Sequence, residues 1–317
     1  CAAPCCAHWQ RSFQADVDQY VTKSMNNANP LVTVGIATFN RPESLRRALS
    51  CICQQTYSNL EIIVSDNASP GEATKRVVED FMAKDNRLKY FCQSSNLGAN
   101  ANFQFVLDTA SGDFFLWMSD DDWRAPSYIE KLLKELQTDD DAVLAFCDIA
   151  VLDEQGRRRH DFYATYLPYL RQFRSYKRPV RLMKFFLQDE SLGKANLLYG
   201  LIRSCAIKST SLASMCEQYG SHGLDNLIVF TLLQKGRLQL VEEMLYGVTA
   251  GNVKFYPTPE SSGLKNKLAA LASYMTYLLA YLRLTNGVMK GMLALLFPVK
   301  VVFSYWHIFK RKFASLS

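Results

Sequence analysis

Three consecutive carboxylates, Asp120, Asp121 and Asp122, follow the apolar run that begins at Phe114. This run predicts a strand that is buried on both faces of a sheet covered by helices. Neighbouring negative charges repel one another, so such a cluster at the end of a buried strand needs a cation or a solvated turn. Taken alone, the triplet predicts either a divalent-cation site or an acidic turn before the helix that begins near Pro126.

Polar residues follow three earlier apolar runs in the same way. These residues are Thr38 and Asn40, then Asp66 and Asn67, and then Asn96 and Gly98. Asn, Asp and Gly are also ordinary turn residues, so each position alone says little. Because ligands collect outside the carboxyl ends of parallel strands, the recurrence at four strand ends predicts one shared crevice.

The elements that must position these residues alternate between strand and helix. Strands are predicted at 30–39, 60–65, 88–92, 112–118 and 142–151, and helices at 43–55, 74–83, 100–109 and 126–137. This alternation favours an α/β fold with a mostly parallel sheet flanked by helices. In the first helix, the spacing predicts a buried face made of Leu45, Ala48, Leu49 and Ile52.

Composition narrows the class of protein. The 317 residues are 49% hydrophobic and carry a net charge of +6, which indicates a globular chain. Lys and Arg are spread along the sequence, so nucleic acid is not the expected partner. The nine cysteines form no CxxC pair, and residues such as Cys92 and Cys147 stand in apolar runs. We therefore expect buried thiols in a reducing compartment.

The motifs at the four strand ends resemble the ordered signature of family 2 glycosyltransferases with the GT-A fold. The matching segments are Ala37 to Arg41, Ser65 to Ser69, Asn96 to Gly98, and Ser119 to Asp122. The resemblance implies a GT-A (Rossmann-like) sheet and a nucleotide diphosphate sugar as donor. Donor-binding residues would be Thr38, Asn40, Arg41, Asp66, Asn96, Gly98, Asp120 and Asp121. A weaker resemblance to enzymes of bacterial O-antigen and polysaccharide assembly implies a glycan or a polyprenyl-diphosphate-linked acceptor.

The acidic triplet would be the DxD motif of this family, which binds Mg²⁺ or Mn²⁺ and the donor diphosphate. A hard cation held by carboxylate oxygens neutralises the charge that grows on a leaving diphosphate. The register of the motif is open: Asp120 and Asp122 can form its acidic pair, or alignment from Leu116 can put Ser119 in the first acidic place. We favour Asp122 as the metal ligand and Asp120 near the ribose, with Asp121 as the rival ligand.

Transfer with inversion also needs a base that takes the proton of the acceptor hydroxyl. Asp225 opens an apolar helix that runs through Leu233, and the resemblance implies that it is this base. Leu224 stands where the family often has a first acid. An Asp at the start of a helix is also an ordinary cap, so a structural role stays open.

The resemblance, together with the sequence pattern of the flanking segments, divides the chain into three parts. Residues 1–29 are expected to be a poorly ordered extension, 30–256 a catalytic domain with a donor half (30–150) and an acceptor half (151–256), and 257–317 a helical appendage. In the last part, Lys290, Pro298 and Lys300 interrupt the apolar segment 288–309, which argues against a clean transmembrane span. Its Tyr305, Trp306 and basic end predict a membrane surface contact through residues 286–317.

The resulting prediction is a metal-dependent, inverting glycosyltransferase that lies in the cytoplasm, peripherally on the inner face of the cell membrane. Packing of the tail on the core or on a second copy in a homo-oligomer is the alternative for its last helices. A sugar nucleotidyltransferase would share the sheet, but its Gly-rich basic loop is missing after the first strand. A non-catalytic scaffold with a relic fold is disfavoured by the intact Asp66, Asp120 to Asp122 and Asp225.

Overall fold

The computed structural model describes residues 29–152, 166–249 and 264–314. The predicted extension 1–29 therefore lies outside the described part, except for Asn29. The chain divides into two compact units. The first comprises the residues up to Ala145 together with Tyr199–Thr210, and the second comprises Phe146–Leu198 and the residues from Ser211 onward.

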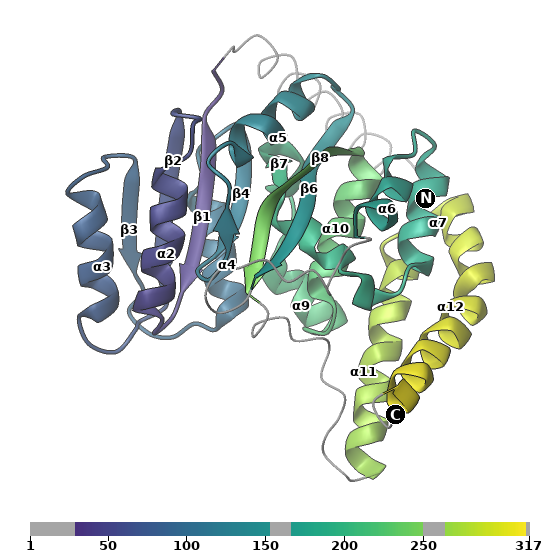
Figure 1. Cartoon of the computed structure of the whole chain (residues 1–317). Helices are drawn as coiled ribbons and strands as arrows, with labels where there is room; N and C mark the ends of the chain where they lie inside the picture. The colour runs from purple at the N-terminus through teal and green to yellow at the C-terminus, as the bar shows by residue number, and fades with distance from the viewer. Residues whose placement is uncertain (1–28, 153–165, 250–263, 315–317) are drawn as a thin grey trace, which may run out of the picture. The chain divides into compact units, whose positions relative to one another are not determined.

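The first unit contains the strand and helix alternation that the sequence predicts (Figure 1). Its strands are β1 (Val32–Thr38), β2 (Leu60–Asp66), β3 (Leu88–Cys92), β4 (Phe114–Ser119), β5 (Trp123–Arg124), the start of β6 (Ala142–Leu152) and β7 (Leu201–Arg203). Its helices are α2 (Pro42–Cys53), α3 (Ala73–Met82), α4 (Ala99–Thr109), α5 (Tyr128–Gln137) and α8 (Ser204–Ile207).

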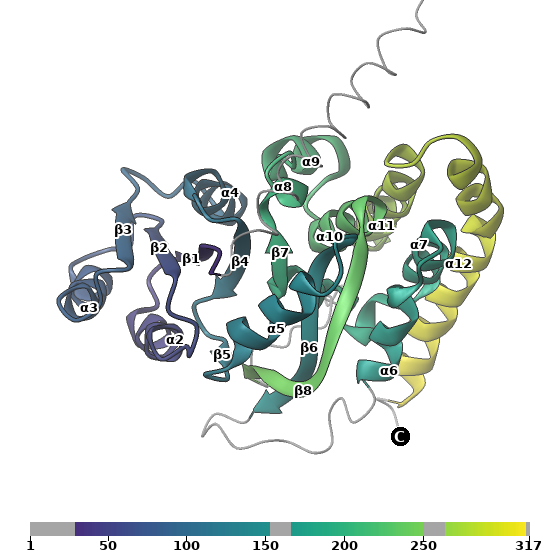
Figure 2. The same cartoon turned by 90° about the horizontal axis from the view of Figure 1, so that it is seen from above.

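Within this unit the strand order is β3-β2-β1-β4-β7-β6. The pairs β2–β3, β1–β2 and β1–β4 are parallel, whereas β7 pairs antiparallel with both β4 and β6. Helices α2 and α3 cover one face of the parallel strands and α4 covers the other (Figure 2). The predicted α/β fold with a parallel sheet between helices is confirmed.

The register of these strands aligns the polar residues that follow them. Thr38 lies opposite Asp66, and Ala37 lies opposite both Ser65 and Ser119. The predicted apolar face of α2 is also confirmed, because Leu45, Ala48, Leu49 and Ile52 are fully buried. The first three strands and β4 thus end at a common edge of the sheet.

The second unit is mainly helical. It contains the rest of β6, β8 (Arg237–Thr249), the helices α6 (Tyr166–Arg171), α7 (Arg178–Leu187), α9 (Leu212–Tyr219), α10 (Leu224–Lys235), α11 (Leu264–Arg283) and α12 (Gly287–Ala314), and short 3-10 turns. Helices α11 and α12 form an antiparallel pair, and α12 also packs against α7 (Figure 1).

The described cysteines differ in part from the expectation of buried thiols. Cys147 is buried, but Cys92 is exposed at the end of β3, a strand that lies at the edge of the sheet. An edge strand with one solvent-facing side keeps alternate residues exposed even when its sequence is apolar. The six cysteines in the described part of the chain are all free thiols.

Candidate functional site

The carboxyl ends of β1 and β4 bring Thr38, Arg41 and Asp120 into contact. The Thr38 hydroxyl donates a hydrogen bond of 2.8 Å to Asp120 Oδ2, and Arg41 Nη1 donates one of 2.7 Å to Asp120 Oδ1. Burial raises the pKa of Asp120 to about 6, although the Thr38 hydrogen bond and the Arg41 charge oppose the rise. Three predicted donor-binding residues therefore form one hydrogen-bonded group.

The other two carboxylates of the triplet have different partners. Asp121 accepts a hydrogen bond of 2.6 Å from Arg41 Nη2 and another of 2.6 Å from the Ser119 hydroxyl. Asp122 is buried and accepts a hydrogen bond of 3.4 Å from Arg124. Arg41 thus bridges the first two carboxylates, whereas the third lies against an arginine that follows it in the sequence.

The end of β2 is built around Asp66, whose two oxygens are both hydrogen-bonded. Oδ1 accepts from the Ser69 backbone N–H at 2.9 Å, and Oδ2 accepts from the Tyr90 hydroxyl at 2.9 Å. Asp66 is 2% exposed. In this structure the side chain therefore fixes the turn after β2, and its role in donor binding remains a prediction.

Asn67 joins the end of β2 to the loop after β3. Its side-chain amide donates to Asn96 Oδ1 at 2.9 Å, and its Oδ1 accepts the Leu97 backbone N–H at 2.8 Å. Asn96 Oδ1 also accepts the Gly98 backbone N–H, and Gly98, with φ of +83°, precedes α4. Asn96 and Gly98 thus lie beside the β2 end, as their place after neighbouring parallel strands predicts.

Two turns at this edge contain a residue with a positive φ angle, a backbone conformation that residues other than glycine rarely adopt. Asn40 has φ of +52° and Ala68 has φ of +61°. The Asn40 backbone N–H donates a hydrogen bond of 2.7 Å to the Ser69 hydroxyl, which ties the two turns together. Asn tolerates this conformation, but for Ala it costs about 1 kcal/mol. Such local strain is concentrated at functional sites in proteins.

Asn102 belongs to this site, although none of the four sequence motifs includes it. Its amide nitrogen donates to the Ser65 carbonyl at 3.0 Å, and its Oδ1 accepts the Ser65 hydroxyl at 2.6 Å. Asn102 is 2% exposed and lies one turn before the buried Val106 on α4. A polar residue on the buried face of a predicted helix is the signal that could have identified it.

The oxygen-rich triplet fits Mg²⁺ or Mn²⁺ in its chemistry, since hard cations prefer carboxylate ligands. Within residues 29–152, 166–249 and 264–314, no three His, Cys, Asp or Glu side chains form a complete metal cage. Mg²⁺ commonly binds through one or two carboxylates and completes its coordination with water and substrate phosphates. The triplet fits that kind of incomplete site.

Asp225 lies in the second unit, in the first turn of α10. Burial raises its pKa, whereas the Asn226 backbone N–H at 2.8 Å and the nearby charges of His222 and Lys194 oppose the rise. A carboxylate with a raised pKa is a stronger base as long as it is ionised at the working pH. The preceding Gly223 caps the helix with φ of +65°, so Asp225 follows a turn of fixed geometry.

Residues 33–198 of the chain match the family described as Glycosyl transferase family 2. The chain belongs to this family. It is 34% identical over 134 residues to the GalNAc(5)-diNAcBac-PP-undecaprenol beta-1,3-glucosyltransferase of Campylobacter jejuni. The aligned segment covers 42% of this chain and 42% of that relative. An uncharacterized glycosyltransferase of Methanocaldococcus jannaschii is 30% identical over 135 residues, or 42% of this chain and 46% of that one. These matches span less than half the length of either relative.

Among solved structures, TarS residues 1–349 from S. aureus has the same fold. The TM-score is 0.54 at 16% identity, and the match covers 86% of this chain and 88% of that chain. The same TarS fragment in complex with UDP matches with a TM-score of 0.54 at 15% identity over the same shares of the two chains. The fold expected from the four motifs is therefore confirmed, and the roles of individual residues remain predictions.

Proposed function

We propose that this family 2 glycosyltransferase moves a sugar from a nucleotide diphosphate sugar to a glycan or lipid-linked acceptor, with inversion at the anomeric carbon. The supporting observation is the convergence of Thr38, Arg41 and the acidic triplet at the carboxyl edge of the parallel strands. An arginine fork and carboxylates at this edge suit a diphosphate with its cation. TarS, which has the same fold, binds UDP.

In the proposed reaction, Asp225 accepts the proton of the acceptor hydroxyl as the hydroxyl oxygen attacks the anomeric carbon. The bond between that carbon and the diphosphate oxygen breaks on the opposite face, and the nucleoside diphosphate leaves. When bound, Mg²⁺ or Mn²⁺ supplies positive charge to the leaving diphosphate. Asp122 would hold the cation, while Arg41, Thr38 and Asp120 would orient the donor.

The acceptor is proposed to be a lipid-linked glycan of cell-surface polysaccharide synthesis. The Campylobacter relative carries a PP-undecaprenol acceptor in its name. A membrane-bound acceptor requires that the enzyme works at a membrane surface, and α12 offers a suitable face. The enzyme would then lie peripherally on the inner face of the cell membrane.

Helix α12 exposes a row of apolar side chains. Its buried face combines the apolar Met289 and Leu293 with the polar Lys300 and Ser304, whereas Val288, Leu295, Val299, Val302 and Phe303 are exposed. The segment Gly287–Ser304 has a mean hydropathy of 1.6 and is 17% buried, and by length and composition it could cross a membrane. The steps of seven, four and three residues from Val288 to Val302 place four of these side chains on one side of the helix. Lipid is the occupant that this apolar side fits, with the basic residues Lys310 to Lys312 favouring an anionic surface.

A donor screen tests the proposed reaction. We expect one nucleotide diphosphate sugar to raise the melting temperature only in the presence of Mn²⁺ or Mg²⁺, because a ligand that binds the folded state stabilises it. With an acceptor present, release of a nucleoside diphosphate is expected. Release of inorganic diphosphate would instead identify a nucleotidyltransferase, and the absence of any donor effect would support a non-catalytic scaffold.

Vesicle sedimentation tests the apolar face of α12. Replacing both Leu295 and Val302 by Glu is expected to weaken binding to anionic vesicles more than tenfold, since burying such side chains contributes about 1.5 to 3 kcal/mol each. Met82→Glu, at an apolar residue of α3 that is also solvent-exposed, is the control. Unchanged vesicle binding would contradict the proposal. So would a wild-type dimer that the double substitution dissociates, because the face would then contact a second copy.

A further inference from the structure

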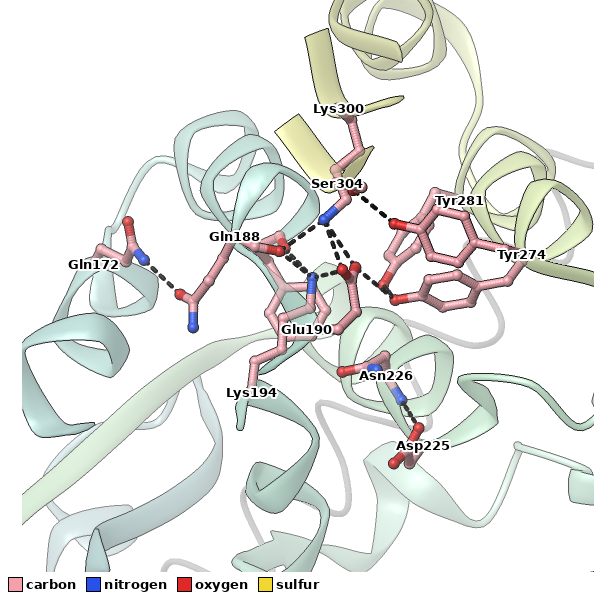
Figure 3. Close-up of polar contacts among 12 residues, drawn as sticks. Gln172, Gln188, Glu190, Lys194, Asp225, Asn226, Tyr274, Tyr281, Lys300 and Ser304 are labelled. Carbon is pink, nitrogen blue, oxygen red and sulfur yellow. Dashed lines mark hydrogen bonds and ion pairs between the residues drawn. The ribbon is translucent and has the colours of Figure 1, made fainter. Parts of the chain in front are cut away.

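Lys300 is a buried cation on the inward face of α12. Its side chain is 1% exposed, and its ammonium group lies 2.8 and 3.0 Å from the two oxygens of Glu190. It also donates a hydrogen bond of 2.8 Å to the Gln188 carbonyl (Figure 3). The helix that exposes an apolar side to solvent therefore places a charge inside the second unit.

Lys194 contacts the same Glu190 carboxylate and the same Gln188 carbonyl as Lys300. Its ammonium group donates to the carbonyls of Phe185 and Gln188 at 2.7 and 2.9 Å and lies 3.3 Å from Glu190. These carbonyls stand at the end of α7, where the helix dipole favours a cation. Burial opposes the charge on Glu190, but the two lysines outweigh it and lower its pKa to about 2. Glu190 is thus held ionised between two lysines.

Glu190 in turn fixes Tyr277 of α11. The Tyr277 hydroxyl donates to Glu190 Oε1 at 3.1 Å and shares a hydrogen bond of 2.6 Å with Tyr281. The Tyr277 ring lies close to Gly223: a Cβ atom on residue 223 would lie 2.5 Å from the nearest carbon of the ring. Tyr277 also contacts the His222 ring edge to face, with ring centroids 5.5 Å apart. The ring therefore packs on the two residues that precede the helix with Asp225.

We propose that Lys300 is a positioning residue for Asp225, and that it acts through Glu190 and Tyr277 on the turn at Gly223. This inference rests on the proposed function, in which Asp225 is the base. In this proposal, one side of α12 contacts the membrane and the other side positions Asp225 within the second unit.

The charge at this position is better explained by positioning than by stability. Replacing a buried ion pair by apolar residues of similar volume is often neutral or stabilising. An apolar side chain at position 300 could fill the same space, but it could not bind the Gln188 carbonyl and Glu190 together. Loss of the ammonium group would leave Glu190 with Lys194, its other lysine, and loosen the hydrogen bond that holds Tyr277.

The test compares Lys300→Met with Lys290→Met, the same change at an exposed position of α12. Assays use the full chain without vesicles, with the donor that the screen identifies. For Lys300→Met we expect a ten- to hundredfold lower turnover per folded molecule and a donor KM within twofold of wild type. Amide hydrogen exchange at residues 222–228 should be at least tenfold faster than in wild type. Lys290→Met should behave as wild type in all three measurements.

Tyr277→Phe serves as a milder variant if Lys300→Met does not fold. It removes one hydroxyl and should reproduce the faster exchange and the lower turnover in smaller measure. Wild-type turnover and exchange in either folded variant would overturn the role of Lys300 while leaving the proposed function intact. Full turnover of Asp225→Asn, or a wild-type protein that transfers from no donor, would overturn the proposed function and this inference with it.

Discussion

Replacement of Asp225 by Asn is expected to lower turnover by about two to four orders of magnitude, the range that general base catalysis contributes. Asn keeps the size of the side chain and can still accept a hydrogen bond from the Asn226 backbone N–H, so the start of α10 should be preserved. It cannot take a proton from the acceptor hydroxyl. The donor KM should stay within about twofold, because only an interaction of the transition state is lost.

Two measurements distinguish this role from a cap at the start of the helix. Asp80→Asn, at an exposed position of α3, is the control and should leave turnover unchanged. In wild type, turnover should fall as the pH drops through the pKa of Asp225, because the protonated acid is no base. Burial raises this pKa, so the loss should occur above the ordinary range of aspartate. A melting temperature that falls together with an unchanged turnover would indicate a cap only.

The donor side of the fold is predictable from the sequence because its signals are local. Each buried strand is a short apolar run, and each ends in Asn, Asp or Gly at the next turn. The parallel register then follows, and it places Thr38 beside Asp66 and the β4 end beside β1. Arg41 was expected near the donor, and the structure adds that it bridges Asp120 and Asp121.

The cluster around Glu190 could not be predicted because its members are far apart in the sequence. Glu190 and Lys300 are separated by 110 positions, and Tyr277 belongs to a third segment. The sequence does show Lys300, like Lys290, as a charge within an apolar segment, which argues against a clean membrane span. A lysine in an apolar helix can also be a buried lysine that is paired with an acid, since a lysine is almost never fully buried unless it is paired. The sequence does not identify that acid, because Glu190 reaches Lys300 only when α12 packs against α7.

The role of Asp225 could also not be decided from the sequence alone. An Asp at the start of an apolar helix is equally typical of a cap, and the pattern cannot separate the two roles. In the structure the N-cap of α10 is Gly223, and Asp225 accepts the Asn226 backbone N–H within the first turn of the helix. Asp225 is also close to His222 and Lys194, two groups whose charges favour its ionised form. This environment supports the role that the resemblance implies.

Replacement of Asp122 by Asn is expected to abolish the part of the donor-induced thermal shift that depends on Mn²⁺. A donor at about a hundred times its Kd stabilises the folded state by about 2.7 kcal/mol. Loss of a metal ligand should weaken donor binding at least tenfold, which removes about 1.4 kcal/mol of that effect. The melting temperature without donor and metal is the control for the fold, since Asp122 is buried and accepts a hydrogen bond from Arg124.

Asp121→Asn is the matched comparison that decides between the two carboxylates. Asp121 already binds Arg41 and the Ser119 hydroxyl at 2.6 Å each, so a cation at this carboxylate would be repelled by the adjacent Arg41 guanidinium. The Asn variant keeps an oxygen for one of these hydrogen bonds, and we expect it to retain the Mn²⁺-dependent shift. The opposite result, with Asp121→Asn insensitive to Mn²⁺ and Asp122→Asn responsive, would assign the cation to Asp121. In that case Arg41 would leave Asp121 when the donor and its cation bind, and its guanidinium group would contact the diphosphate directly.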